Sequence, residues 1–246
     1  MMATLKGRCP VAKSVAPVRI LSGAEQLAAQ IRERVLSGEL TEETLLAGER
    51  DLVSQSGLSR ATVREALRIL ETEGLIYTRP GRNGGTRVRL PDRDHMSRNL
   101  GTFIRGNQID DTLVLEAREY LEVAAAELAA LRRTPDDLKL IEAAMLAVEQ
   151  AQDPEGMLNA NIAFHHAIAE ASHNALISDF LYSLAATIKD LVYRDEIEGL
   201  YAGAPREAMF KVHRRIFSAI SDGDGNAAAR RMKRHLEGSL KVHTKG

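Results

Sequence analysis

Residues able to ligate a metal fall on apolar helical faces in the second half of this 246-residue sequence. Asn161 and His165 lie one helical turn apart within "NANIAFHHAIAE", and a buried amide beside a buried imidazole costs free energy unless both find partners. At about 100° per residue, His213 and His235 fall on apolar faces of two further predicted helices, and His166 falls at the edge of the first.

Imidazole binds Zn²⁺, Ni²⁺, Cu²⁺ and Fe²⁺, and a set of three histidines leaves coordination positions open. The pattern alone is compatible with a divalent transition metal, such as zinc or nickel, held by Asn161, His165, His213 and His235. The competing interpretation is that each histidine is a core residue with its own hydrogen-bond partner. His95, His173 and His243 lie near the ends of elements and look incidental.

The elements that must position these residues are all predicted to be helical. Breaks such as "RTPDD", "QDPEG" and "SDGDGN" contain helix stoppers or capping residues. Short connections favour antiparallel neighbours, so we expect residues 91–246 to form an all-α bundle of six or seven helices. The predicted helices span residues 94–105, 110–133, 135–151, 155–172, 174–199, 205–221 and 224–243.

The first half has a different pattern. Helical periodicity in residues 23–40, 48–57 and 58–75 gives way to two short strands around a glycine-rich turn in residues 75–90. Three helices followed by a β-hairpin is the winged form of the helix-turn-helix. We expect a flexible tail over residues 1–20, this winged domain over 21–90, and a linker at Pro91 and Asp92.

The winged domain presents polar and basic side chains at the start of its third helix. These residues suit the major groove, where arginine binds guanine or phosphate, while glycines in "RPGRNGG" allow a close approach to phosphate. The predicted DNA contacts are Arg50, Ser59, Arg60, Thr62, Arg64, Gly81 and Arg82. The alternatives are an ordinary solvated face or a winged domain that binds protein.

Composition limits the remaining possibilities. Residues 1–90 hold 14 Lys and Arg against 10 Asp and Glu, and the rest holds 19 against 24, which suggests two domains with different partners. Cys9 is the one cysteine, so an internal disulfide framework is excluded. The sequence has no apolar run of about 18 residues that would span a membrane. We expect a cytoplasmic protein without a membrane partner.

Two parts of the sequence resemble known families. "ERDLVSQSGLSRATVREALRILETEGLIYTRPGRNGG" closely resembles the N-terminal signature of GntR-family bacterial transcription regulators. "EAREYLEVAAAELAA", "NIAFHHAIAEASHN", "HRRIFSAISDGDGNAA" and "MKRHL" resemble the FCD effector domain of the FadR subfamily. The resemblance implies that Asn161, His165, His213 and His235 hold a metal and that Arg118 faces an anionic effector, unless it pairs with a neighbouring glutamate. Many relatives have aspartate where this chain has Asn161.

These features predict a homodimeric transcription regulator, a repressor in most such proteins, which binds a pseudo-palindromic DNA operator. A small carboxylate metabolite in the metal-containing bundle would modulate it. Two alternatives remain at this point: a regulator whose metal is structural or absent, and a metal-dependent enzyme, for which no HExxH-like motif is present.

Overall fold

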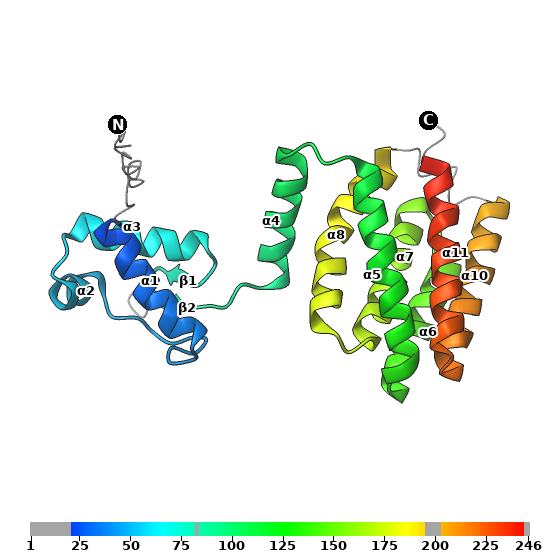
Figure 1. Ribbon diagram of the computed structural model, residues 1–246, viewed down its shortest axis with the longest axis horizontal. Helices are drawn as coiled ribbons and strands as arrows, with labels where there is room; N and C mark the ends of the chain where they lie inside the picture. The colour runs from blue at the N-terminus through cyan, green and yellow to red at the C-terminus, as the bar shows by residue number, and fades with distance from the viewer. Residues whose placement is uncertain (1–20, 82–83, 195–202, 244–246) are drawn as a thin grey trace, which may run out of the picture. The chain divides into compact units, whose positions relative to one another are not determined.

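The computed structural model describes residues 21–81, 84–194 and 203–243. The chain divides into two compact units, Met1–Pro91 and Asp92–Gly246. Figure 1 shows the short helices and hairpin of the first unit and the long helices of the second.

The first unit has the predicted winged-helix architecture. Its helices are α1 (Gly23–Leu36), α2 (Glu49–Ser56) and α3 (Arg60–Thr72), followed by strands β1 (Ile76–Arg79) and β2 (Gly85–Val88). The strands pair antiparallel, with Ile76 opposite Val88 and Arg79 opposite Gly85. Three apolar side chains of α3, Val63, Ala66 and Leu70, are fully buried, and their helical spacing makes α3 the centre of this core.

Capping residues fix the helix starts in this unit. Ser22 forms a capping box with Glu25 at the start of α1, and the Ser59 hydroxyl accepts a hydrogen bond from the Thr62 backbone N–H at the start of α3. Gly57, in the left-handed conformation, ends α2 and makes the turn to α3. The helix predicted for residues 23–40 ends at Leu36, because Ser37 caps it and Gly38 has a φ of +79°.

The second unit is helical throughout its described residues. Figure 1 shows its helices lying side by side with their axes broadly aligned. The helices are α4 (Arg93–Gly106), α5 (Asp111–Arg132), α6 (Pro135–Gln150), α7 (Pro154–Ala171), α8 (Ala175–Arg194), α10 (Gly203–Asp222) and α11 (Gly225–His243). The prediction of an all-α bundle is therefore confirmed. Of the helix predicted for residues 174–199, the last five residues lie outside the described ranges.

The core of the bundle brings α5, α7, α10 and α11 together. Ala126, Ala129 and Ala130 of α5 are fully buried, and such small side chains let α11 pack closely against α5. Phe164 and Ile216 fill the space between α7 and α10. The polar side chains of the site described below are held within this apolar frame.

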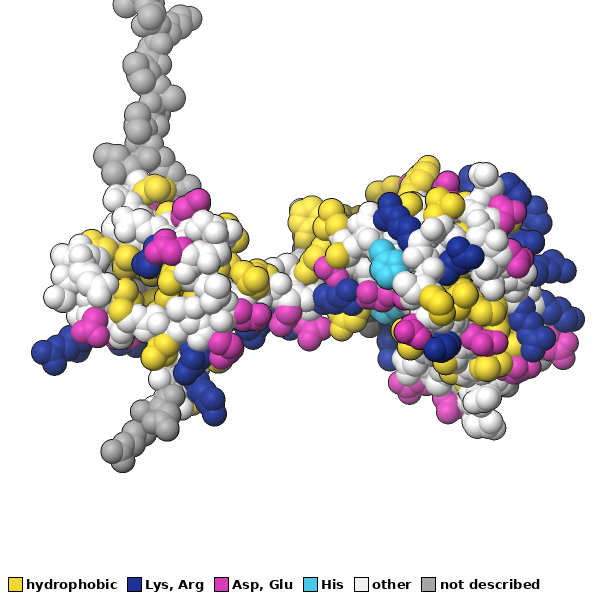
Figure 2. Space-filling view, turned by 90° about the horizontal axis from the view of Figure 1, so that it is seen from below, with side chains coloured by type: hydrophobic (Ala, Val, Ile, Leu, Met, Phe, Trp, Pro, Cys, Tyr) yellow, Lys and Arg dark blue, Asp and Glu magenta, His cyan; other side chains and the backbone are white. Residues whose placement is uncertain are grey.

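No helix among the described residues is long and apolar enough to cross a membrane. Figure 2 shows that charged side chains are spread over each unit and that hydrophobic side chains are exposed among them.

Candidate metal centre and nucleic-acid interface

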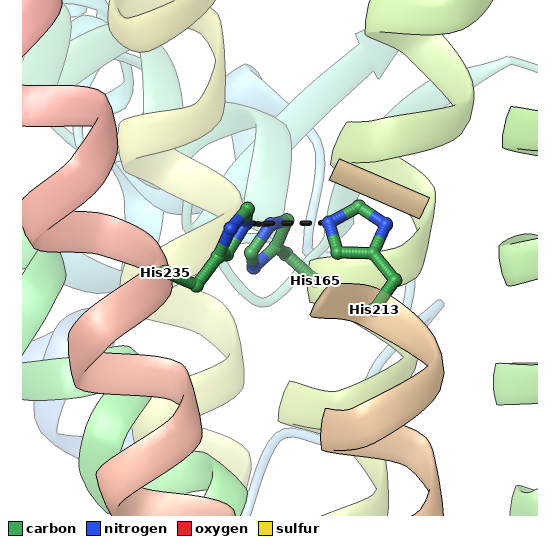
Figure 3. A group of neighbouring side chains, drawn as sticks. All are labelled: His165, His213 and His235. Atoms are coloured by element: carbon green, nitrogen blue, oxygen red, sulfur yellow. Dashed lines mark hydrogen bonds between the residues drawn. The ribbon is translucent and has the colours of Figure 1, made fainter. Parts of the chain in front are cut away.

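Three histidines from three helices meet inside the second unit (Figure 3). His165 lies on α7, His213 on α10 and His235 on α11. The Nε2 atom of His235 is 3.2 Å from that of His213 and 3.3 Å from that of His165. One nitrogen from each ring lies within 4.8 Å of the others, an arrangement that a single ion could bridge.

The surroundings hold these imidazoles in place and keep two of them, His213 and His235, uncharged. His213 is fully buried and stacks on Phe164 at a centroid distance of 4.3 Å, and His165 is 4% exposed. Burial, followed by the neighbouring histidines, lowers the pKa of His213 well below its usual value, and burial and His165 lower that of His235 to about 3. A metal ligand must be a neutral imidazole, and these two rings already are at neutral pH.

Asn161 lies one turn before His165 on α7, as the spacing predicted. Its side-chain Oδ1 atom is buried and has no hydrogen-bond partner among the described residues. A buried acceptor without a partner costs about 1–3 kcal/mol, which a bound cation would offset. The donor set of three imidazoles and an amide oxygen thus fits a transition metal.

Glu122 of α5 is a member of this site that the sequence analysis missed. Its carboxylate is 4% exposed and contacts His165 Nδ1, while its other oxygen accepts a hydrogen bond from Arg118 Nε at 2.5 Å. Burial alone would raise the pKa of Glu122, but Arg118 and His165 outweigh it, so the net pKa is lowered and the group is ionised. A carboxylate behind a histidine fixes the ring so that Nε2 faces the metal.

Arg118 forms an ion pair with Glu122. Such a pair was the predicted alternative to effector binding by Arg118. Its side chain is 12% exposed, and the pair with Glu122 uses one of the five N–H donors of the guanidinium. Arg118 also lines a small cavity beside this ion pair. A signal for Glu122 was present in the sequence, because it stands four residues after Arg118 on the face that carries the buried alanines.

Two hollows lie beside the histidine cluster. The inner cavity, of about 20 Å³, lies between α5, α7 and α8 and is lined by Arg118, Glu122 and His165 among others. The outer pocket, of about 380 Å³, lies between α4, α7 and α8. Ile162, His166 and Ala185 line both. Of the three clustered histidines, only His165 reaches the inner cavity.

Two further histidines, His166 and His173, are not members of the cluster. His166 is in the wall of both hollows, where burial and then His165 lower its pKa. His173 is exposed, and its Nε2 is 2.9 Å from Asp137 Oδ2.

The predicted DNA-contacting residues lie around the start of α3. Arg50, Arg60 and Arg64 are exposed, and Arg64 is 3.7 Å from Glu49. Ser59 and Thr62 are tied to each other, since the Ser59 hydroxyl caps α3 and lies 2.8 Å from the Thr62 hydroxyl. These two residues therefore stabilise the helix start whether or not they meet DNA.

The hairpin turn holds the remaining two predicted contacts. Gly81 is exposed with a φ of +112°, and a Cβ added there would meet nothing within 4 Å. Arg82 lies outside the described residues.

Both units match known families. Residues 113–238, more than half of the chain, match the FCD domain, and residues 23–88 match the family described as bacterial regulatory proteins, gntR family. The chain is a GntR-family transcription regulator with an FCD domain. The predicted resemblance is confirmed, and the enzyme alternative is set aside, because the relatives are named as transcription regulators.

Several relatives of this GntR regulator carry descriptive names. It is 30% identical to the "Putative L-lactate dehydrogenase operon regulatory protein" of Escherichia coli K12, covering 87% of this chain and 83% of that protein. It is 29% identical to the regulator LutR of Bacillus subtilis, covering 82% and 92%. It is 25% identical to the galactonate operon transcriptional repressor of E. coli K12, covering 85% and 91%.

A solved structure supports the fold. The GntR protein of Streptococcus agalactiae superposes with a TM-score of 0.58 at 24% identity, covering 89% of this chain and 99% of that one.

Proposed function

We propose that this GntR regulator represses transcription by binding a pseudo-palindromic operator as a homodimer, and that a small organic acid bound in a metal-containing pocket of the FCD domain modulates it. The observation that carries this proposal is the meeting of two buried imidazoles, His165 and His213, and the half-buried His235 beside an ionised Glu122–Arg118 pair. A named repressor among the relatives, that of the galactonate operon, favours repression.

The proposed metal ligands are Asn161, His165, His213 and His235. Zinc suits three imidazoles and one oxygen donor, and nickel is the alternative. A bound ion would supply a fixed positive charge next to the inner cavity. Glu122 would orient His165 through its Nδ1 atom, and the Phe164 ring would hold His213 by stacking.

The proposed effector is a small carboxylate. Arg118 lines the inner cavity and would pair with the acid, in competition with Glu122. The relatives' names refer to operons for L-lactate dehydrogenase and galactonate, both concerned with hydroxy acids. An effector shifts a conformational equilibrium only if it binds one conformation more tightly than the other. We assign the local difference between the two conformations to a rearrangement of the Arg118–Glu122 ion pair.

An exposed apolar stripe on α5 supports the homodimer. Leu113, Tyr120 and Leu131 share one face of this helix, because they are spaced by 7 and 11 residues, and they are 55%, 70% and 63% exposed. Apolar side chains gathered on one face mark an interaction surface. Two copies joined there would read two half-sites, the arrangement that gives helix-turn-helix proteins their specificity.

We propose that the winged domain contacts the major groove and its backbone through Arg50, Ser59, Arg60, Thr62 and Arg64, with Gly81 and Arg82 making contacts at the wing. Exposure of the three helical arginines around the α3 start supports this. Since a bacterial operator lies in the cytoplasm, we place the protein there, with no membrane partner.

The DNA assignment is tested with sequences that the wild-type protein selects from a random pool. Arg60→Ala should lower affinity by about 10- to 100-fold, the effect of losing a base-contacting arginine. The matched control is Arg68→Ala, which removes an equally exposed arginine two turns further along α3. Equal binding by wild type and Arg60→Ala at physiological salt would refute the assignment.

A further inference from the structure

The outer pocket is built from polar side chains of α4, α7 and α8. Its volume of about 380 Å³ lies in the range of small-molecule sites. The polar residues in its wall are Asp94, Ser97, Arg98, Asn159, Tyr182 and Lys189. The inner cavity, at about 20 Å³, has room for little more than one or two water-sized groups. Any ligand larger than a carboxylate head therefore needs the outer pocket.

Existing contacts hold much of this polar wall in place. The Tyr182 hydroxyl donates to Asp94 Oδ1 at 3.0 Å, and Lys189 Nζ donates to Asn159 Oδ1 at 2.9 Å. The Tyr182 oxygen and the second Asp94 oxygen can still accept, and the guanidinium of Arg98 can still donate. Such a mixture of donors and acceptors matches hydroxyl groups, which do both, better than an alkyl chain.

His166 stands where the two hollows meet. It lies in the wall of both, and its ring centroid is 5.5 Å from that of Tyr182. A ring nitrogen of an imidazole can accept a hydrogen bond from a hydroxyl group. From this position the ring is suited to a hydroxyl passing between the two hollows.

We propose that the outer pocket binds the hydroxylated chain of the effector, a polyhydroxy carboxylic acid longer than three carbons, and that His166 accepts a hydrogen bond from one of its hydroxyls. This inference rests on the proposed function, since it takes the carboxylate to lie at Arg118 in the inner cavity. His166 is then a specificity-determining residue rather than a metal ligand. A site that bonds a hydroxyl rejects the analogue lacking it, because the polar groups of the site would stay unpaired.

Calorimetric titration of the zinc-loaded full-length protein tests this. The probes are D-galactonate and D-gluconate against hexanoate, which has the same six carbons and no hydroxyls, and L-lactate against propionate. We expect at least one six-carbon hydroxy acid to bind wild type about tenfold or more tightly than hexanoate and more tightly than L-lactate. His166→Phe should lower the affinity for that hydroxy acid about tenfold and leave the affinity for hexanoate unchanged. His166→Gln, which keeps a hydrogen-bond acceptor, should retain most of the wild-type affinity for the hydroxy acid.

Two further measurements guard against a variant that fails to fold. Zinc stoichiometry in His166→Phe should equal that of wild type. Arg98→Ala alters only an exposed side chain of α4 at the outer pocket, and it should weaken the six-carbon hydroxy acid about threefold or more without affecting L-lactate.

The outcomes separate the two proposals. If the acids bind but hexanoate binds as tightly as the hydroxy acids, the proposal for the outer pocket is wrong. The same holds if both His166→Phe and Arg98→Ala keep the full wild-type preference for hydroxy acids. In either case the proposed regulation by an organic acid is unaffected. If L-lactate binds as tightly as the six-carbon acids, the required chain length is wrong. If no acid binds zinc-loaded wild type, the proposed function fails together with the inference.

Discussion

At the scale of single residues, the candidate metal centre is short of negative charge. Its four proposed ligands are neutral, and the nearest ionised carboxylate, Glu122, contacts His165 on the nitrogen remote from the other two rings. Charge and hardness of the donors set how tightly a divalent ion is held. As a proposed ligand, the neutral amide of Asn161 would hold the ion more weakly than a carboxylate in that position.

Asn161→Asp should raise zinc affinity by about tenfold, since a carboxylate adds a charged donor where the buried Oδ1 now lies. A competition titration with a chromophoric chelator measures this change. The control is Asn159→Asp, which adds the same charge to an exposed position on the same helix. If the two variants bind zinc equally, Asn161 is not a ligand.

The sequence predicted the clustering of the histidines better than their surroundings. His165, His213 and His235 follow from helical periodicity, because each stands on an apolar face that had to turn inward. Glu122 was missed although it stands on the helical face of the buried alanines, because a glutamate four residues from an arginine is usually a solvated pair. His166 was placed at a helix edge, and the packing of α4 and α8 makes that edge a pocket wall.

At the scale of elements, capping residues predicted the positions of the helix ends more accurately than the apolar periodicity did. Asp153 accepts from the Gly156 backbone at the start of α7, and Thr134 forms a capping box with Asp137 at the start of α6. The glycine-rich turn predicted the two strands on either side of it. No sequence pattern predicted the β-bridge between Leu45 and Arg87, which joins the loop before α2 to the hairpin. Non-local pairings of this kind depend on the folded core.

The wing depends on a glycine whose role is steric. A Cβ at Gly84 would lie 2.1 Å from the Arg79 carbonyl oxygen, so Gly84→Ala forces the hairpin to shift. We expect a loss of about 1–3 kcal/mol in the free energy of unfolding of the first unit, typical of overpacking, with weaker DNA binding. Denaturant unfolding measures the loss. Gly48→Ala is the control, because its Cβ would meet only Asp51 Oδ2 at 3.7 Å. Similar stabilities for both variants would contradict this role.

At the scale of the whole molecule, the proposed function requires two copies of the chain to join. Tyr120 lies in the middle of the exposed stripe on α5, and a charge there would be buried on dimerisation without a partner. Tyr120→Glu should raise the dimer dissociation constant by tenfold or more in analytical ultracentrifugation. Leu140→Glu, at a position 63% exposed on α6, should leave it unchanged. A dimer of wild-type strength in Tyr120→Glu would place the interface elsewhere.

We propose that the FCD domain of this regulator holds one divalent ion through the histidine cluster. Titration of zinc into chelator-treated protein tests this, comparing wild type with His213→Ala and with His173→Asn, which alters an exposed histidine outside the cluster. We expect one ion per chain for wild type and His173→Asn, and at least a tenfold loss of affinity for His213→Ala. Equal zinc binding by all three proteins, or none by wild type, would contradict it.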